Sequence, residues 1–186
     1  MTLPDQKSGL PGAADSLEGV VNSLFRSRRK ANSGSMVIAF SSSLRGEGVS
    51  YVTRTVFDVI RQASPGVSLQ VDMEWLKNQE GVAEPGESVR HPLWATNWEF
   101  RKELISRLRS QHQYVGVDCQ SLAASEDVLS LAPLVDGVIL VVEADRTKRT
   151  QIIKTSRRIE GAGGKVLGLV LNKRRYQIPR VIYDLL

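Results

Sequence analysis

A glycine-bearing loop is the first feature of the sequence that could do chemistry. Residues 41–50 read Ser-Ser-Ser-Leu-Arg-Gly-Glu-Gly-Val-Ser, and they follow a wholly apolar run, Met36–Phe40. The stretch after them, Val49–Ala63, has apolar residues at helical spacing. A strand, a glycine loop and a helix N-terminus together present backbone N–H groups to an anion. The sequence therefore predicts an anion cradle at this loop.

The loop lacks the cation that such a cradle carries when it binds nucleotide phosphates. The phosphate-binding pattern ends in Gly-Lys-Ser or Gly-Lys-Thr, and the corresponding triplet here is Gly48-Val49-Ser50. The glycine is present, and Ser50 keeps a hydroxyl able to hold Mg²⁺. The lysine is a valine, and Ser43 stands where the pattern has its first glycine.

Acidic residues follow two further predicted strands. Asp72-Met73-Glu74 comes after one strand and Asp118-Cys119 after the next. Carboxylates at these strand ends are where the metal of a nucleotide is usually held. Each could instead cap a loop or a helix, and both interpretations stay open. Their appearance after consecutive strands favours a shared site.

The elements that must position these residues alternate along the chain. Apolar runs predict five strands, at Met36–Phe40, Val67–Val71, Tyr114–Val117, Gly137–Val142 and Val166–Leu171. Helical spacing predicts helices at Leu17–Arg28, Val49–Ala63, Trp98–Gln111 and Thr147–Glu160, and a short one that Ser125 caps and that ends near Pro133. Continuously apolar strands indicate a mainly parallel sheet covered on both faces. We expect an α/β three-layer sandwich whose site lies at the carboxyl ends of the strands.

Length and composition favour one domain. Residues 1–16 of the 186 are rich in Gly, Pro, Ser and Ala and predict a flexible lead-in, so residues 17–186 form the expected domain. No apolar run is long enough to cross a bilayer, and no signal pattern opens the chain, so we expect a cytoplasmic protein. The net charge of +5 comes from short basic clusters without interleaved aromatics. They favour solvated helix ends and loops over a specific nucleic-acid contact.

Other chemistry-bearing residues give weaker signals. His91 and His112 lack the spacing of a metal site, so we expect no metal there. Cys119 follows a buried strand and suits a small core residue better than a nucleophile. Trp75, Trp94 and Trp98 flank the Glu-, Pro- and Gly-rich stretch Asn78–Asn97, which we read as a loop. Whether they close that loop over the sheet edge or form a docking patch stays open.

The loop resembles a known pattern. Ser42–Ser50 is similar to the S-x-P-G-E-G-K-S loop of the bacterial tyrosine kinases of capsule and exopolysaccharide synthesis, which are relatives of the MinD/ParA ATPases. Tyr114–Asp118, Leu131–Val138 and Gly164–Asn172 resemble that family more continuously. The resemblance runs from about Leu17 to the C-terminus, with a gap at Asn78–Asn97 where the family has a longer insert, and it implies a P-loop NTPase-like fold.

The resemblance also implies roles for individual residues. Gly46, Gly48 and Ser50 would line the phosphate site, Asp72 and Glu74 would match an acidic pair, Asp118 would match the Walker B aspartate, and Asn172 would read adenine. A strand-end asparagine that satisfies backbone groups is an equally good interpretation of Asn172.

The departures from the family pattern predict lost activity. Val49 replaces the lysine that neutralises the β- and γ-phosphates, and Arg45 replaces the loop proline. The family's E-x-x-R-x-x-R oligomerisation motif falls on Glu18, Val21 and Leu24, so both arginines are gone. We therefore expect no kinase-type ring, with the apolar face of Leu17–Phe25 packed on its own domain or in a small dimer. The tyrosine-rich tail is reduced to Tyr176 and Tyr183.

These observations favour a pseudo-kinase or pseudo-ATPase with no catalytic residue. We expect MgATP binding to be weak or absent, because an apolar side chain offers the triphosphate no charge. As the resemblance implies, the partner would be a membrane-embedded polysaccharide co-polymerase or another export component, which would recruit the chain to the inner membrane. Two alternatives remain open: an active ATPase or tyrosine kinase in which Arg45 replaces the lysine, and a ParA-like protein that binds DNA.

Overall fold

Five parallel strands form the centre of the computed structural model, which describes residues 19–22, 24, 34–79, 94 and 97–173. The strands are β1 (Met36–Ser42), β2 (Ser68–Asp72), β3 (Tyr114–Asp118), β4 (Gly137–Glu143) and β5 (Val166–Asn172). Their order across the sheet is β2-β3-β1-β4-β5, and every neighbouring pair is parallel. All five strands predicted from the apolar runs are therefore present.

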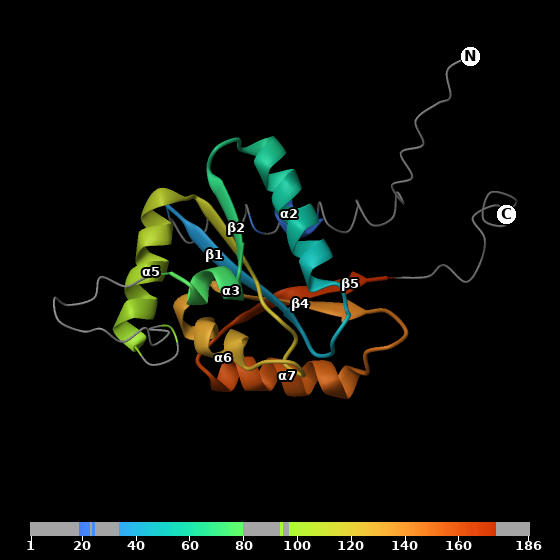
Figure 1. The fold of residues 1–186 in the computed structure, drawn as a ribbon. Helices are drawn as coiled ribbons and strands as arrows, with labels where there is room; N and C mark the ends of the chain where they lie inside the picture. The colour runs from blue at the N-terminus through green and yellow to red at the C-terminus, as the bar shows by residue number, and fades with distance from the viewer. Residues whose placement is uncertain (1–18, 23, 25–33, 80–93, 95–96, 174–186) are drawn as a thin grey trace, which may run out of the picture.

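Helices cover both faces of this sheet (Figure 1). On one face α2 (Val49–Ala63) buries Val56, Phe57 and Ile60 against the sheet. The other face is covered by α3 (Met73–Lys77), α5 (Trp98–Gln111), α6 (Asp127–Leu131) and α7 (Arg149–Gly161), with the 3₁₀ turn η1 (Ala132–Leu134) after α6. This confirms the α/β three-layer sandwich, because continuously apolar strands such as β1 need cover on both sides.

The helix boundaries follow local capping. The bounds predicted for α2 and α5 are correct. The N-cap of α6 is Glu126 rather than the predicted Ser125, which lies one residue earlier and accepts a 3.2 Å hydrogen bond from the Asp127 amide. Helix α6 ends at Leu131, and η1 continues past Pro133. Helix α7 begins two residues later than predicted, because Lys148 is extended and acts as its N-cap. Helix α3 was not predicted; it forms because the Asp72 carboxylate accepts the Trp75 amide at 2.7 Å.

The helix predicted near the N-terminus is described in part. Residues 19–22 and 24 are helical, and Val21 and Leu24 are each 3% exposed within the core on the α2 side of the sheet. Their side chains thus pack on the chain's own domain. Residues 1–18, His91, Tyr176 and Tyr183 lie outside the described residues, as does most of the loop predicted at Asn78–Asn97.

The three tryptophans have different surroundings. Trp94 is buried in the core on the α5 side, whereas Trp75 and Trp98 are partly exposed. The Arg101 guanidinium carbon lies 5.8 Å from the Trp94 ring centre and 5.9 Å from that of Trp98. Trp94 is therefore a core residue, while the exposed faces of the other two remain available for contact.

The edge strand β5 departs from the expectation that both sheet faces are covered. Leu169 and Leu171 are each more than half exposed, whereas Val170 between them is buried. Period-two alternation places the two leucines on one face. This is the face of their neighbour Leu140, on which α7 lies, and α7 leaves both side chains more than half exposed.

The described helices include none that could span a membrane, because none is both long enough and apolar enough to cross one.

Candidate functional site

The glycine loop lies at the carboxyl end of β1, as the sequence predicts. Gly46 and Gly48 have φ angles of +80° and +90°, which only glycine adopts without strain. Gly48 is the N-cap of α2, which has no side-chain cap and no acidic residue in its first turn. The first N–H groups of α2 are therefore uncapped by a side chain, and a helix N-terminus in this state favours an anion.

Val49, which follows Gly48 at the first position of α2, is apolar and buried. It is 9% exposed and belongs to the core on the α2 side of the sheet, together with Ile139, Val141 and Val170. A side chain packed in this way supplies no charge to the loop. The position at which the family pattern has its cation is thus part of the hydrophobic core.

Ser50, Asp72 and Asp118 converge beside the loop. Asp72 and Asp118 are register partners at the ends of β2 and β3. Burial raises the pKa of Asp118 from its ordinary value; a hydrogen bond with Ser50 lowers it, the Asp72 charge raises it and Arg54 lowers it. The structure therefore brings together three of the site residues that the sequence predicts, with Ser50 beside the predicted Walker B carboxylate.

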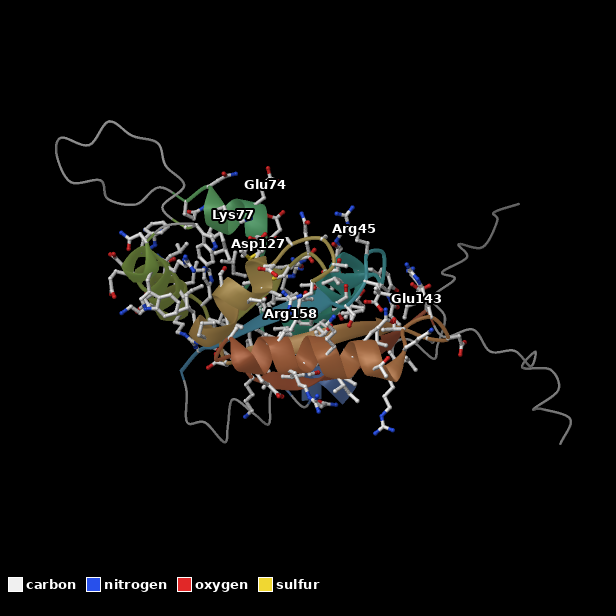
Figure 2. All side chains as sticks on the ribbon, turned by 90° about the horizontal axis from the view of Figure 1, so that it is seen from below. Arg45, Glu74, Lys77, Asp127, Glu143 and Arg158 are labelled. Carbon is white, nitrogen blue, oxygen red and sulfur yellow. The ribbon has the colours of Figure 1, made fainter. Side chains whose placement is uncertain are left out.

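The acidic residues also have structural roles. The Asp72 carboxylate caps α3, which is the alternative that the sequence left open. Glu74 lies exposed in the first turn of that helix and is labelled in Figure 2. In the part of the chain that the structure describes, no group of three or more His, Cys, Asp or Glu side chains could hold a metal ion.

Asn172 contacts the loop backbone. Its side-chain amide donates a 2.9 Å hydrogen bond to the carbonyl oxygen of Glu47. This contact supports the interpretation of Asn172 as a strand-end residue that satisfies backbone groups. With its nitrogen bonded to the loop, the Asn172 side chain still has its oxygen available to accept a hydrogen bond from a base such as adenine.

Two cations hold the preceding loop carbonyls. Arg146 Nη1 lies 3.2 Å from the Arg45 oxygen, and Lys173 Nζ lies 2.6 Å from the Gly46 oxygen. Both cations also reach Glu143 Oε2, at 2.7 and 3.3 Å. The hydrogen bond with Arg146 is the main cause that lowers the pKa of Glu143, and Lys173 adds to it. With Asn172, three consecutive carbonyls of the loop thus accept side-chain donors; we call this arrangement the carbonyl clamp.

Glu47 is a loop residue whose role sequence reasoning missed. Its side chain is fully buried and accepts the Leu44 amide at 2.7 Å, the Glu143 amide at 3.3 Å and the Thr147 hydroxyl. A buried carboxylate needs such donors. Two signals were available in the sequence: its place between two glycines, and the glutamate at the same place in the S-x-P-G-E-G-K-S pattern. The roles of Lys173 and Arg146 were missed because both lie in basic clusters that suit solvated loops.

Two further residues were considered in the sequence: Arg45 as a substitute cation and Cys119 as a core residue. Arg45 is exposed at the rim of the loop (Figure 2), and its backbone rather than its side chain takes part in the carbonyl clamp. Cys119 is 1% exposed, and burial raises the pKa of its thiol well above the ordinary value. The thiol therefore stays protonated, as the core interpretation requires.

A strand, a glycine loop and a helix at the centre of a parallel sheet define the fold of a P-loop NTPase. No protein-family model matches the chain. The tyrosine-protein kinase CpsD of Streptococcus agalactiae is 31% identical over 92 residues, which are 50% of this chain and 40% of CpsD. The succinoglycan biosynthesis transport protein ExoP of Rhizobium meliloti is 39% identical over 70 residues, which are 38% of this chain and 9% of ExoP. The chain thus spans less than half of the length of these relatives.

Solved structures agree on the fold. The kinase domain of the Escherichia coli tyrosine kinase ETK superposes with a TM-score of 0.65 at 17% identity, covering 86% of this chain and 77% of that domain. The MinC:MinD cell division complex of Aquifex aeolicus gives a TM-score of 0.53 at 13% identity, covering 76% and 70%. The homologues of this chain are bacterial tyrosine kinases and a polysaccharide transport protein, and its fold is that of the kinase domains and MinD-like ATPases. The resemblance read from the sequence is confirmed.

Proposed function

We propose that this chain is a non-catalytic relative of the bacterial tyrosine kinases that serves as a binding or regulatory subunit in exopolysaccharide or capsule synthesis and export. The names of its relatives support the setting, since one is a succinoglycan biosynthesis transport protein. The proposed loss of catalytic activity is inferred from the residues of the glycine loop.

Val49 is the observation that carries the proposal. Phosphoryl transfer depends on charge neutralisation, and a lysine at this position and Mg²⁺ supply much of it. Val49 is instead packed in the core, so a triphosphate in the loop would lose hydration without gaining a cation there. Such a loss amounts to several kcal/mol of transition-state stabilisation, at about 1.4 kcal/mol for each tenfold in rate.

The retained glycines allow weak anion binding only. Gly46, Gly48 and the uncapped N-terminus of α2 still suit a phosphate-sized group. We therefore expect MgATP binding to be weak or absent, with no hydrolysis and no autophosphorylation. Within this proposal no residue is catalytic, and Ser50, Asp72, Asp118 and Asn172 are remnants of a nucleotide site.

The partner in this proposal is a membrane-embedded polysaccharide co-polymerase or another export component. The chain would act in the cytoplasm and reach the inner membrane through that partner, as a monomer or a homodimer. Co-purification from cells that express both proteins tests this point. Recovery of chromosomal DNA with salt-sensitive affinity, and of no envelope protein, would favour the ParA-like alternative.

A nucleotide titration tests the central claim. Calorimetry of the purified chain should detect weak or no MgATP binding, and a phosphate-release assay no turnover. The Val49→Lys variant should bind MgATP at least about tenfold more tightly, whereas Val49→Met, the control for disturbed packing, should not. Micromolar affinity with turnover in the natural chain would refute the proposal. Loss of that activity in Arg45→Ala would then identify Arg45 as the substitute cation.

A further inference from the structure

The outer face of α7 forms a continuous stripe that faces away from the sheet. Thr150, Ile153, Lys154, Arg157 and Arg158 line a shallow hollow along it. Their spacing of three and four residues places them on one face of the helix, opposite the buried Thr155 and Ile159. Figure 2 shows α7 across the near side of the molecule, with no other described element in front of it.

Uncompensated positive charge gathers on this part of the chain. Residues 145–160 contain six cations and two carboxylates, namely Arg146, Lys148, Arg149, Lys154, Arg157 and Arg158 against Asp145 and Glu160. They account for most of the net charge of +5. Arg146 pairs with Glu143 and Arg158 with Glu126. Lys154 and Arg157 form no ion pair with any residue that the structure describes, so their charge is available to a partner.

An exposed apolar side chain lies within these cations. Ile153 is 40% exposed and is adjacent on the helix to Thr150, Lys154 and Arg157. An apolar centre with a charged rim in which arginine is prominent is the composition of a protein interface. The hollow gives the apolar centre a shape into which another side chain can fit.

We propose that the outer face of α7 binds an acidic segment of a partner protein. Carboxylates of that segment pair with Lys154 and Arg157, and an apolar residue between them packs on Ile153. An anionic membrane is the weaker candidate: each cation adds about 1 kcal/mol near such a surface, and one isoleucine offers little apolar area for insertion. The inference does not depend on whether the glycine loop is active.

Fluorescence anisotropy with a defined probe tests the surface. A fluorescein-labelled peptide of repeated Glu-Glu-Leu should bind the full chain, and its affinity should fall with salt. The same peptide with glutamine in place of glutamate should not bind. Lys154→Glu/Arg157→Glu should weaken binding about tenfold or more. The matched control, Lys102→Glu/Arg107→Glu on the exposed side of α5, changes the net charge equally and should keep most of the affinity.

Three further outcomes decide the proposal. An equal loss in the α5 control would overturn it, because binding would then follow net charge alone. Binding of phosphatidylglycerol vesicles or duplex DNA that requires Lys154 and Arg157, without peptide binding, would also overturn it. Ile153→Ser should lower peptide affinity and leave its salt dependence unchanged; an unchanged affinity would exclude the apolar contact. MgATP titration of the same samples keeps these results separate from those on the loop.

Discussion

The side-chain amide of Asn172 lies 2.9 Å from the carbonyl oxygen of Glu47, although 125 positions separate the two residues. Gly48 makes this approach possible, since a β-carbon built on it would lie 2.2 Å from Asn172 Nδ2. The end of the edge strand β5 thus fixes the glycine loop after β1. The shape of the loop therefore depends on contacts from distant parts of the chain as well as on its own glycines.

Removal of the Asn172 amide should loosen the loop. Asn172→Ala should lower the free energy of unfolding by about 1 kcal/mol, the usual net value of one hydrogen bond. Amide hydrogen exchange at Gly46–Gly48 should become faster. Asn172→Asp, of nearly the same shape, places an acceptor against an acceptor and should be at least as destabilising. Unchanged exchange in both variants would contradict the proposed hold on the loop.

Gly48 and Asn172 should be energetically coupled. Gly48→Ala introduces a β-carbon at a φ of +90°, which costs about 1–2 kcal/mol by itself, and adds a clash with Asn172. In an Asn172→Ala background the clash is absent and only the backbone strain remains. Urea denaturation of the two single variants and the double variant should therefore give a non-additive cycle. Additive costs would show that the close contact does not matter.

Asp118 should make stability depend on pH. Its raised pKa, caused mainly by burial, means that the folded chain holds this proton more tightly than the unfolded chain. The free energy of unfolding therefore falls as the pH rises from the pKa of Asp118 in the unfolded chain to its higher pKa in the folded chain. Above the folded pKa this loss of stability is complete and stays constant. Asp118→Asn should raise the melting temperature at pH 7, and the gain should disappear below pH 4 or so. Asp58→Asn is the control, because Asp58 lies on the exposed side of α2 and its replacement changes the net charge equally. The same gain in that variant would argue against burial as the cause.

Leu24 should contribute to folding rather than to assembly. Its side chain, like that of Val21, is buried on the α2 side of the sheet. Leu24→Ala should lower the free energy of unfolding by about 2–5 kcal/mol, without changing the mass measured by light scattering. Leu24→Arg, which supplies a charge that the kinase-type motif has at this position, should unfold the chain rather than create a ring. A ring-sized particle in the natural chain would contradict this prediction.

The sequence alone predicted the sheet because its signals are local. Each strand is a short apolar run between turn residues, and the bounds of α2 and α5 follow from helical spacing. Helix α3 was missed because five residues are too few to show a period. The exposed Leu169 and Leu171 were missed because an edge strand and a central strand can have the same apolar pattern.

The sequence by itself determined which groups the glycine loop offers to a phosphate: two glycines, the hydroxyl of Ser50 and, at Val49, a valine instead of a lysine. Those are facts of residue type and spacing. Only the tertiary structure decided how the loop is held, because Arg146, Asn172 and Lys173 reach it from β5 and from the loop after β4. Parallel strands place their carboxyl ends at one edge of the sheet, and this brings residues more than a hundred positions apart within hydrogen-bonding distance. No local pattern encodes such a contact. The burial of Val49 was likewise decided by the tertiary structure, because it follows from the packing of α2 on the sheet.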